Sequence, residues 1–294
     1  MTLSDYGVLD RYQTRTSTPR AQFERVDPVV WGRVESPELA TFDRYGYSVI
    51  DALLSPDKVA EFSTETRRLA EDPDLWLDER LIIEKKARRV RSIFEVHKLS
   101  AAVGDLVRQT RIAGLAEQIL GSEVYLHQSR VNYMPGFTGA GFYWHSDFET
   151  WHAEDGMPAP RAVSLSIALT DNHPYNGSLM VMPGSHRVFV PCHGETPPDH
   201  YRDSLREQEV GVPGQDDIEK LGQAHGISQF TGAAGSALLF DSNLMHGSSN
   251  NITPFPRSNI FLVFNSVENT LGAPYAADEP RPTYIANRDF TPVR

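Results

Sequence analysis

The sequence predicts a mainly β fold with flanking helices, whose core is a closed sheet or a double-sheet jelly roll. After Gly121 the chain consists of short segments rich in β-branched and aromatic residues and bounded by Gly, Pro, Asn or Asp, as strands are. These segments follow one another without the long helices that separate the strands of a parallel sheet. The expected strands lie at residues 124–134, 161–170, 178–184, 236–241 and 259–267.

Two helix starts precede this β region. Ser36 is expected to begin a short helix, and residues 46–50 then form a brief strand. Ser55 before Pro56 is typical of a second helix start, because Ser caps the first turn and Pro fits the first helical position. This helix should end near residue 71. Its buried face would comprise Val59, Phe62 and Leu69.

The stretch before Gly121 is expected to hold a further strand and the longest helix. Residues 87–94 have the pattern of a strand with basic residues on one side. A solvated or ion-paired face is the preferred interpretation of these cations, and binding of an anionic substrate is the alternative. Residues 101–120 repeat apolar residues at helical spacing and should form one helix, with Gly121 as its C-terminal stop.

The 294 residues are expected to form one domain, since β units with helical additions often reach this size. An insert at residues 191–229 is rich in Pro, Gly and charge, and a helix is expected near residues 216–223. Inserts of this length in a compact domain tend to be lids or binding loops. The expected parts are an N-terminal arm (1–30), a mostly helical flank (31–120), a jelly-roll core (121–270) that contains the insert, and a C-terminal segment (271–294).

Composition argues against several classes of protein. The formal net charge of −11 disfavours a nucleic-acid binder, which usually presents a basic face. No apolar run is long enough for a transmembrane helix, and the polar N-terminus does not read as a secretory signal. The single cysteine, Cys192, excludes an intrachain disulfide and favours a reducing cytoplasm.

One short motif predicts a metal site. His145 and Asp147 form the only His-x-Asp of the sequence, and on a strand they would point to the same face. His246 follows the expected strand at 236–241, which could lie beside the first in a jelly roll. Two histidines and one carboxylate are the facial triad of non-haem Fe(II) oxygenases. Arg257, eleven residues after His246, could bind a carboxylate of a 2-oxoacid cosubstrate through two parallel hydrogen bonds.

Several segments closely resemble the ectoine hydroxylases, a family within the phytanoyl-CoA dioxygenase-like Fe(II)/2-oxoglutarate oxygenases. The resemblance extends from about residue 24 to residue 288. FYWHSDFETWH at 142–152, together with PFPRSN at 254–259, is far more specific than the three metal ligands alone. The remaining segments are HQSRVNYMPGF, IALTDN, NGSLMVMPGSH and FNSVEN.

The resemblance implies a fold and a reaction. The fold would be a double-stranded β-helix core, jelly-roll or cupin-like, often in a homodimer. The reaction would hydroxylate ectoine, a compatible solute of the osmotic stress response, to 5-hydroxyectoine. It would use Fe(II), O2 and 2-oxoglutarate and release succinate and CO2.

The resemblance also implies roles for individual residues. Ectoine has an amidinium, which suits aromatic faces, and a carboxylate, which suits an arginine. From the residues alone, core packing is the preferred interpretation of Trp151 and Phe264. The implied iron ligands and catalytic residues are His145, Asp147 and His246. The implied cosubstrate contacts are Arg257, Ser248, Asn132 and Gln128, and the implied ectoine contacts are Gln128, Trp151, Phe264 and Arg281.

The sequence departs from the family pattern at Met134, where family members commonly have a lysine that helps to bind 2-oxoglutarate. Methionine supplies neither a charge nor a donor. This departure favours weaker cosubstrate binding, or the same machinery acting on another small zwitterion or a free amino acid. A remote alternative is a metal-binding or ligand-binding jelly roll without catalysis.

Overall fold

The structure is a computed structural model that describes residues 18–23, 25–84, 89–205 and 210–294. Two antiparallel sheets form its core, which confirms the predicted mainly β fold with a jelly-roll centre and flanking helices. The first seventeen residues of the expected N-terminal arm, and parts of the strand and insert expected at 87–94 and 191–229, lie outside the described residues.

The larger sheet has seven strands in the order β1-β9-β6-β11-β4-β3-β2. Its long centre comes from β4 and β11, which pair antiparallel along nearly their whole length. Three of its strands come from the segment that was expected to be mostly helical flank. The bounds are β1 Tyr47–Ile50, β2 Leu81–Ile83, β3 Val90–Phe94, β4 Val124–Met134, β6 Ala162–Ala168, β9 Ala237–Asp241 and β11 Arg257–Ser266.

The smaller sheet has four strands in the order β5-β10-β7-β8. An apolar cluster lies between the sheets and combines Leu179 and Val181 of β7 with Leu238 and Phe240 of β9. Burial of this cluster holds the two sheets together. The bounds are β5 Phe142–His145, β7 Leu179–Val181, β8 Ser228–Gln229 and β10 His246–Ser248.

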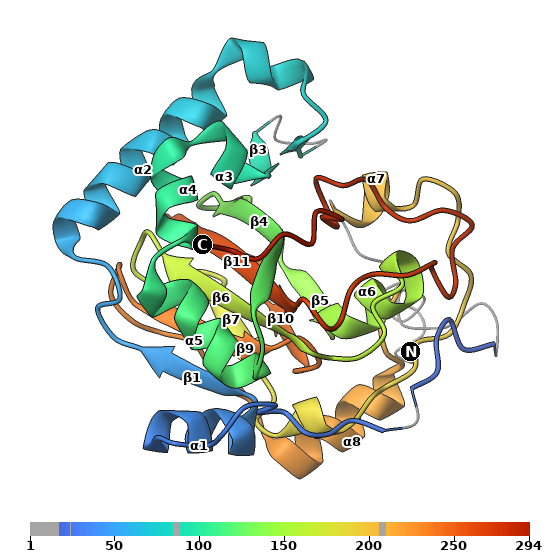
Figure 1. The fold of residues 1–294 in the computed structure, drawn as a ribbon. Coiled ribbons are helices and arrows are strands. Elements are labelled where there is room, and N and C mark those ends of the chain that lie inside the picture. Colours follow the sequence, from blue (N-terminus) through green and yellow to red (C-terminus); the bar gives the residue numbers. More distant parts are fainter. Residues whose placement is uncertain (1–17, 24, 85–88, 206–209) are drawn as a thin grey trace.

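Helices cover the outer face of the larger sheet, where Figure 1 shows α2, α4 and α5 along one side of the strands. Phe62 and Leu69 of α2 are buried in this layer as predicted, while Val59 is only partly buried. The bounds in the N-terminal half are α1 Pro37–Tyr45, α2 Pro56–Glu71, η3 Pro73–Leu77, α3 Val96–Leu99, α4 Ala101–Val107, α5 Thr110–Leu120 and α6 Asp147–Asp155. Those in the second half are η4 Ser185–Arg187, α7 Tyr201–Ser204 and α8 Gln215–His225.

The prediction of one helix over residues 101–120 is wrong, because the chain breaks into α4 and α5 at Gln109, whose backbone is extended. Val107 and Ile112 are both buried. Five residues apart on one helix, their side chains would point about 140° away from each other. The break lets both side chains reach the same core.

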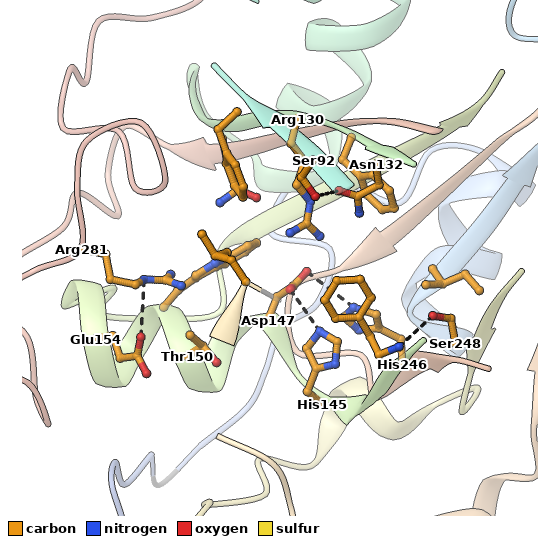
Figure 2. Close-up of a pocket in the computed structure, with 18 of the residues that line it drawn as sticks. Ser92, Arg130, Asn132, His145, Asp147, Thr150, Glu154, His246, Ser248 and Arg281 are labelled. Atoms are coloured by element: carbon orange, nitrogen blue, oxygen red, sulfur yellow. Dashed lines mark hydrogen bonds and ion pairs between the residues drawn. The ribbon is translucent and has the colours of Figure 1, made fainter. Parts of the chain in front are cut away.

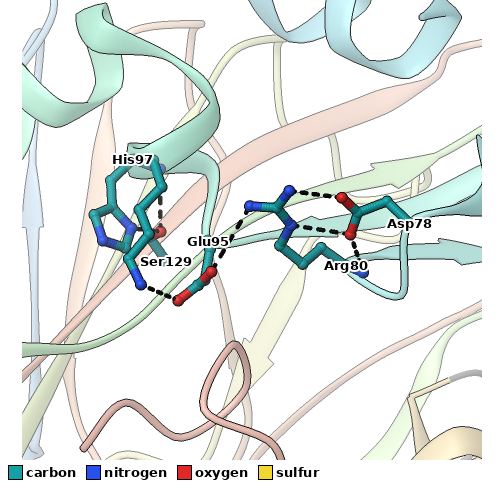
Figure 3. A network of polar contacts seen from close by, with 6 residues as sticks. Asp78, Arg80, Glu95, His97 and Ser129 are labelled. Atoms are coloured by element: carbon teal, nitrogen blue, oxygen red, sulfur yellow. Dashed lines mark hydrogen bonds and ion pairs between the residues drawn. The ribbon is translucent and has the colours of Figure 1, made fainter. Parts of the chain in front are cut away.

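A polar network fixes α3 to the outer face of β4 (Figure 3). The backbone N–H of His97 donates to Ser129 Oγ, and the His97 ring nitrogen Nδ1 lies 2.6 Å from the same oxygen. Glu95, beside this pair, binds Lys98 of the same helix and lies 3.8 Å from Arg80, which also binds Asp78. Ser129 lies between two residues of β4 that point to the other face of the strand, so the network supports β4 from behind.

The insert contains the predicted helix, observed as α8, and a short α7 that was not predicted. Figure 1 shows α7 and the C-terminal segment on the same side of the molecule as α6. Among the described residues, no helix is both long and apolar enough to cross a membrane.

Candidate active site

Two histidines meet across neighbouring strands of the smaller sheet. His145 ends β5 and His246 begins β10, and the two are direct partners in this antiparallel pair. Their ring centroids are 4.2 Å apart. The strand expected at 236–241 was predicted to lie beside β5, and this prediction is wrong. That strand is β9, which belongs to the other sheet, and the short β10 pairs with β5 instead. The conclusion that the histidines are close nevertheless holds.

Asp147 is the third member of the cluster, although it does not lie on the strand as expected. The strand ends at His145, and Asp147 is the first residue of α6. Ser146 caps this helix, because its Oγ accepts the N–H of Glu149. The Asp147 carboxylate oxygens lie 3.8 Å from His145 Nε2 and 3.9 Å from His246 Nε2 (Figure 2).

Both imidazoles are oriented so that Nε2 faces the carboxylate. His145 Nδ1 lies 2.7 Å from the Tyr143 carbonyl oxygen, and His246 Nδ1 lies 2.9 Å from that of Leu244. A carbonyl only accepts, so each Nδ1 carries the hydrogen and each Nε2 has a free lone pair. Burial lowers the pKa of His145 to about 4, and the proximity of His246 acts in the same direction. A neutral imidazole is the form that binds a metal.

These three side chains fit a transition-metal ion. One ligand atom from each lies within 4.8 Å of the others, and the set combines two imidazole nitrogens with a carboxylate oxygen. Backbone carbonyls behind ligating histidines fix the ring orientation in known metal sites. The set therefore matches a facial triad for Fe(II).

Hydrogen bonds outside the strand ladder also join the two segments that carry the triad. Ser146 Oγ donates to Asn243 Oδ1 at 3.1 Å, so it connects the β5–α6 junction to the turn before His246. Asn243 also donates to the carbonyl oxygens of His186 and Val188, at 2.8 and 3.1 Å. Asn243 thus fixes the spacing of the two histidines through side-chain bonds rather than strand pairing alone.

Arg257 lies in the same cavity as the triad and has no ion-pair partner among the described residues. Its side chain is buried, its Nε and Nη1 make no hydrogen bond, and its Nη2 contacts only the sulfur of Met134 at 3.9 Å. Burial lowers its pKa to about 10, and the neighbouring Arg91 adds to the effect. A buried cation without a counter-charge is costly, so this cavity is suited to a ligand carboxylate.

The other expected cosubstrate contacts line the same cavity. Asn132 accepts a hydrogen bond from Ser92 Oγ at 2.8 Å, and Ser248 Oγ accepts the N–H of Phe142 at 3.1 Å. The Gln128 amide donates to the Ile285 carbonyl at 2.6 Å, so its amide oxygen remains for a ligand.

Two of the expected ectoine contacts line the cavity as well, and one does not. Trp151 belongs to its wall, and so does Arg281, whose guanidinium binds both oxygens of Asp155. Phe264 instead packs in the core under the helices, and it does not line the cavity. It is seven residues from Arg257 on the same strand, so alternation directs the two side chains to opposite faces.

Several further side chains line the wall that were not predicted from the sequence, among them Arg130, Thr150 and Glu154. Arg130 is partly buried, its Nε makes no hydrogen bond within the described part of the chain, and its guanidinium lies 4.9 Å from the Phe261 ring. Burial lowers its pKa, which the Asp147 carboxylate opposes. Thr150 and Glu154 lie on the inner side of α6. The signal for Arg130 was available, because alternation on β4 places it on the same face as Gln128 and Asn132.

The fold and the site together define a class. A jelly roll that carries two histidines and a carboxylate beside a buried arginine has the features of a non-haem iron oxygenase. A sequence model of the phytanoyl-CoA dioxygenase (PhyH) family matches residues 42–259. The chain belongs to this family.

Close relatives are ectoine dioxygenases. The protein of that name from Nocardia farcinica is 73% identical over 285 residues, which cover 97% of this chain and 96% of the relative. The ectoine dioxygenase of Streptomyces coelicolor is 53% identical over the full length of both chains. The crystal structure of EctD from S. alaskensis with 2-oxoglutarate and 5-hydroxyectoine has a TM-score of 0.82 and 42% identity, and covers 96% of each chain. The same enzyme with bound Fe also has a TM-score of 0.82, at 41% identity, and covers 94% of this chain and 96% of that one.

Proposed function

We infer that this chain is an Fe(II)- and 2-oxoglutarate-dependent dioxygenase that hydroxylates ectoine to 5-hydroxyectoine, with release of succinate and CO2. The observation that carries this conclusion is one cavity that contains both the His145, Asp147 and His246 cluster and the unpaired cation of Arg257. The likeness to ectoine dioxygenases over nearly the whole chain supports the substrate.

The triad would hold Fe(II), which supplies the activation of O2 when it is bound. Arg257 would bind the distal carboxylate of 2-oxoglutarate, and Ser248 and Asn132 would orient it. The protein's own contribution is to hold one C–H bond of the substrate near the metal and to exclude water.

Ectoine would lie toward α6, where Trp151 offers an aromatic face to the amidinium. Its carboxylate needs a cation, and two arginines line the cavity near α6. Arg281 is already bound by Asp155, whereas Arg130 has no carboxylate within ion-pair distance among the residues described. Arg130 is therefore our first assignment for the substrate carboxylate, and Arg281 is the second.

The test is a mass spectrum of the products. Purified protein with Fe(II), ascorbate, 2-oxoglutarate, air and ectoine should add one oxygen to ectoine and form an equal amount of succinate. Both products should disappear without iron or 2-oxoglutarate. Succinate without oxidised ectoine would instead indicate another small zwitterion as the substrate, and the presence of Met134 at the cosubstrate end motivates that alternative.

Asp147→Ala provides the matched variant. Loss of the only carboxylate in the triad should abolish product formation and iron retention, because two imidazoles alone form an incomplete facial set. Iron content after dialysis and product formation are both measured. Near-normal hydroxylation in this variant would exclude the proposed metal site.

We also propose a cytoplasmic location and a homodimer. The single cysteine, Cys192, is free and buried, which suits a reducing compartment. Sedimentation of the purified chain would test the dimer.

A further inference from the structure

The N-terminal arm is attached to the start of the insert. Pro19 forms an isolated antiparallel bridge with His193, and the backbone N–H of Arg20 donates to the Cys192 carbonyl at 2.9 Å. Further along the arm, the Phe23 ring contacts Phe148 of α6 at 5.2 Å between centroids. The arm therefore lies against the site helix rather than extending from the molecule.

The arm places a buried cation behind that helix. Arg20 is 3% exposed, and its Nη2 donates to Glu154 Oε1 at 2.5 Å. Its Nε lies 3.6 Å from Glu149 Oε1. The pKa of Arg20 lies above its usual value, because the attraction of the two carboxylates outweighs the effect of burial. One guanidinium thus lies against two buried acids of α6, and burial raises the pKa of the Glu149 carboxyl.

The opposite end of the chain supplies a second cation to α6. Arg281 binds both oxygens of Asp155 and lies 3.6 Å from Glu154 Oε2. Without Arg20 and Arg281, the three acids Glu149, Glu154 and Asp155 would be buried on one nine-residue helix without compensation. Burying carboxylates without a compensating charge is strongly unfavourable, so α6 depends on both arginines for its stability.

Part of this cluster of arginines and acids lines the cavity. Glu154 and Trp151 lie on α6 and line the cavity, and Asp147 begins the same helix. Figure 2 shows Arg281 and Glu154 on one side of Asp147, with Ser248 on the other. The Glu154 carboxylate that Arg20 binds therefore lies at the end of the cavity next to α6, where ectoine is proposed to bind. The opposite end is the one where Arg257 and Ser248 would hold 2-oxoglutarate.

We infer that Arg20 is a positioning residue for substrate: it fixes the Glu154 carboxylate by a hydrogen bond, and thereby holds α6 so that Trp151 lines the cavity. This inference rests on the proposed function. Arg20 and Arg281 both lie outside residues 42–259, the part of the chain that matches the family. The contacts of Arg20 and Arg281 with the acids of α6 thus lie outside the matched family core, at the end of the cavity where ectoine is proposed to bind.

Arg20→Met in the full-length enzyme tests the inference. The KM for ectoine should rise by about tenfold or more, the usual effect of removing a supporting residue, while the KM for 2-oxoglutarate stays within about twofold. Calorimetric titration of ectoine into anaerobic enzyme with Fe(II) and 2-oxoglutarate should show the same loss of affinity. The matched control is Arg25→Met, which removes an exposed arginine of the same arm that pairs only with Asp27 and should leave both KM values unchanged.

Two further variants separate positioning from general stability. Arg20→Lys keeps the positive charge but loses the planar guanidinium that can contact two carboxylates at once, and should give an intermediate KM for ectoine. In Arg20→Met with Glu149→Gln, a neutral amide of the same shape replaces the acid that the missing guanidinium leaves without its ion-pair partner, and part of the ectoine affinity should return although one more native contact is gone. A merely structural role predicts the opposite, since the double variant would then be worse.

The outcomes are distinct. A folded Arg20→Met enzyme with unchanged KM for ectoine, or with equal losses for ectoine, 2-oxoglutarate and iron, would overturn the inference and leave the proposed function intact. If Arg20→Met does not fold, the same comparison between Arg20→Lys, the double variant and Arg25→Met decides. Failure of the unmodified enzyme to oxidise ectoine would overturn the proposed function and the inference together.

Discussion

At the scale of single residues, Arg257 is set apart by what surrounds it. Met134 is its direct partner across β4 and β11, and the thioether lies against Gly177 so closely that an added Cβ there would be 2.1 Å from the sulfur. The methionine therefore fills space beside the guanidinium without adding charge. Arg257 would then remain the main cation for the distal carboxylate of 2-oxoglutarate under the proposed function.

Met134→Lys should lower the KM for 2-oxoglutarate by about an order of magnitude, because one more charge-assisted hydrogen bond contributes about 1.5–3 kcal/mol before its burial cost. It should also destabilise the enzyme without cosubstrate, since two cations would then be buried side by side. The KM and the shift in melting temperature on adding 2-oxoglutarate measure these effects. Met134→Leu, which stays apolar, serves as the control, and an unchanged KM in the lysine variant would show that position 134 does not face the carboxylate.

At the scale of elements, the junction between β5 and α6 decides the geometry of the site. The letters Ser146, Asp147, Phe148 and Glu149 form the S-x-x-E pattern of a capped helix start. That pattern explains why the strand stops before Asp147. A carboxylate in the first turn is also stabilised by the positive end of the helix dipole.

Asn243→Ala should weaken this arrangement more than it weakens the fold. The side chain bonds Ser146 and two carbonyls near η4, so its removal should cost about 1–3 kcal/mol of unfolding free energy and raise the dissociation constant for Fe(II) about tenfold. Metal titration followed by tryptophan fluorescence measures the latter. Ser242→Ala removes a neighbouring buried hydroxyl that has no partner, and should change little. Equal metal affinity in both variants would contradict the role of Asn243.

The sequence predicted the long strands well and their partners less well. The bounds of β4 agree with residues 124–134 because eleven residues of strand-forming composition leave little ambiguity. The three-residue β10 could not be recognised, since so short a segment has no periodicity, and its pairing with β5 depends on the whole jelly roll. The same limit explains why the predicted proximity of His145 and His246 was right although the strand predicted to pair with β5 was wrong.

Side-chain direction was the other source of error. Because side chains alternate along β11, Phe264 points away from the face that carries Arg257. The ectoine contact that the family resemblance implied for Phe264 should therefore not have been assigned. Alternation along β4 would have added Arg130 to the site. Arg20 had no such signal, because its partners on α6 are more than 125 residues away in the sequence.

At the scale of the whole molecule, the N-terminal arm and the C-terminal segment both contact α6, although it lies near the middle of the sequence. Arg20 comes from the N-terminal arm, and Arg281 and Arg288 come from the C-terminal segment. Arg288 donates to the Asp155 carbonyl at the helix C-terminus, which satisfies a group that the helix leaves open. Segments outside the jelly roll thus hold α6 in place and contribute Arg281 to the cavity wall.

Several histidines are buried without charge, which links the stability of the molecule to pH. Burial lowers the pKa of His127 and of His186 to about 4. An unfolded histidine has a pKa near 6.5, so below this value the unfolded state binds more protons than the folded state. The unfolding free energy should therefore fall as the pH decreases from about 6.5 to about 4, and it should change little through these groups above that range.

His127 allows this linkage to be tested at one position. Its ring is fully buried against Trp151, and neither ring nitrogen is bonded to any residue that the structure describes, so His127→Phe loses no hydrogen bond among them. At pH 5.0 one such histidine lowers the unfolding free energy by about 2 kcal/mol, and at pH 7.5 by almost nothing. The unfolding free energy measured with urea should therefore fall less between pH 7.5 and pH 5.0 in the variant than in the unmodified protein, by about 2 kcal/mol. An unchanged difference would mean that His127 accepts a proton in the folded protein as readily as in the unfolded chain, and that the cavity wall beside Trp151 is open to water.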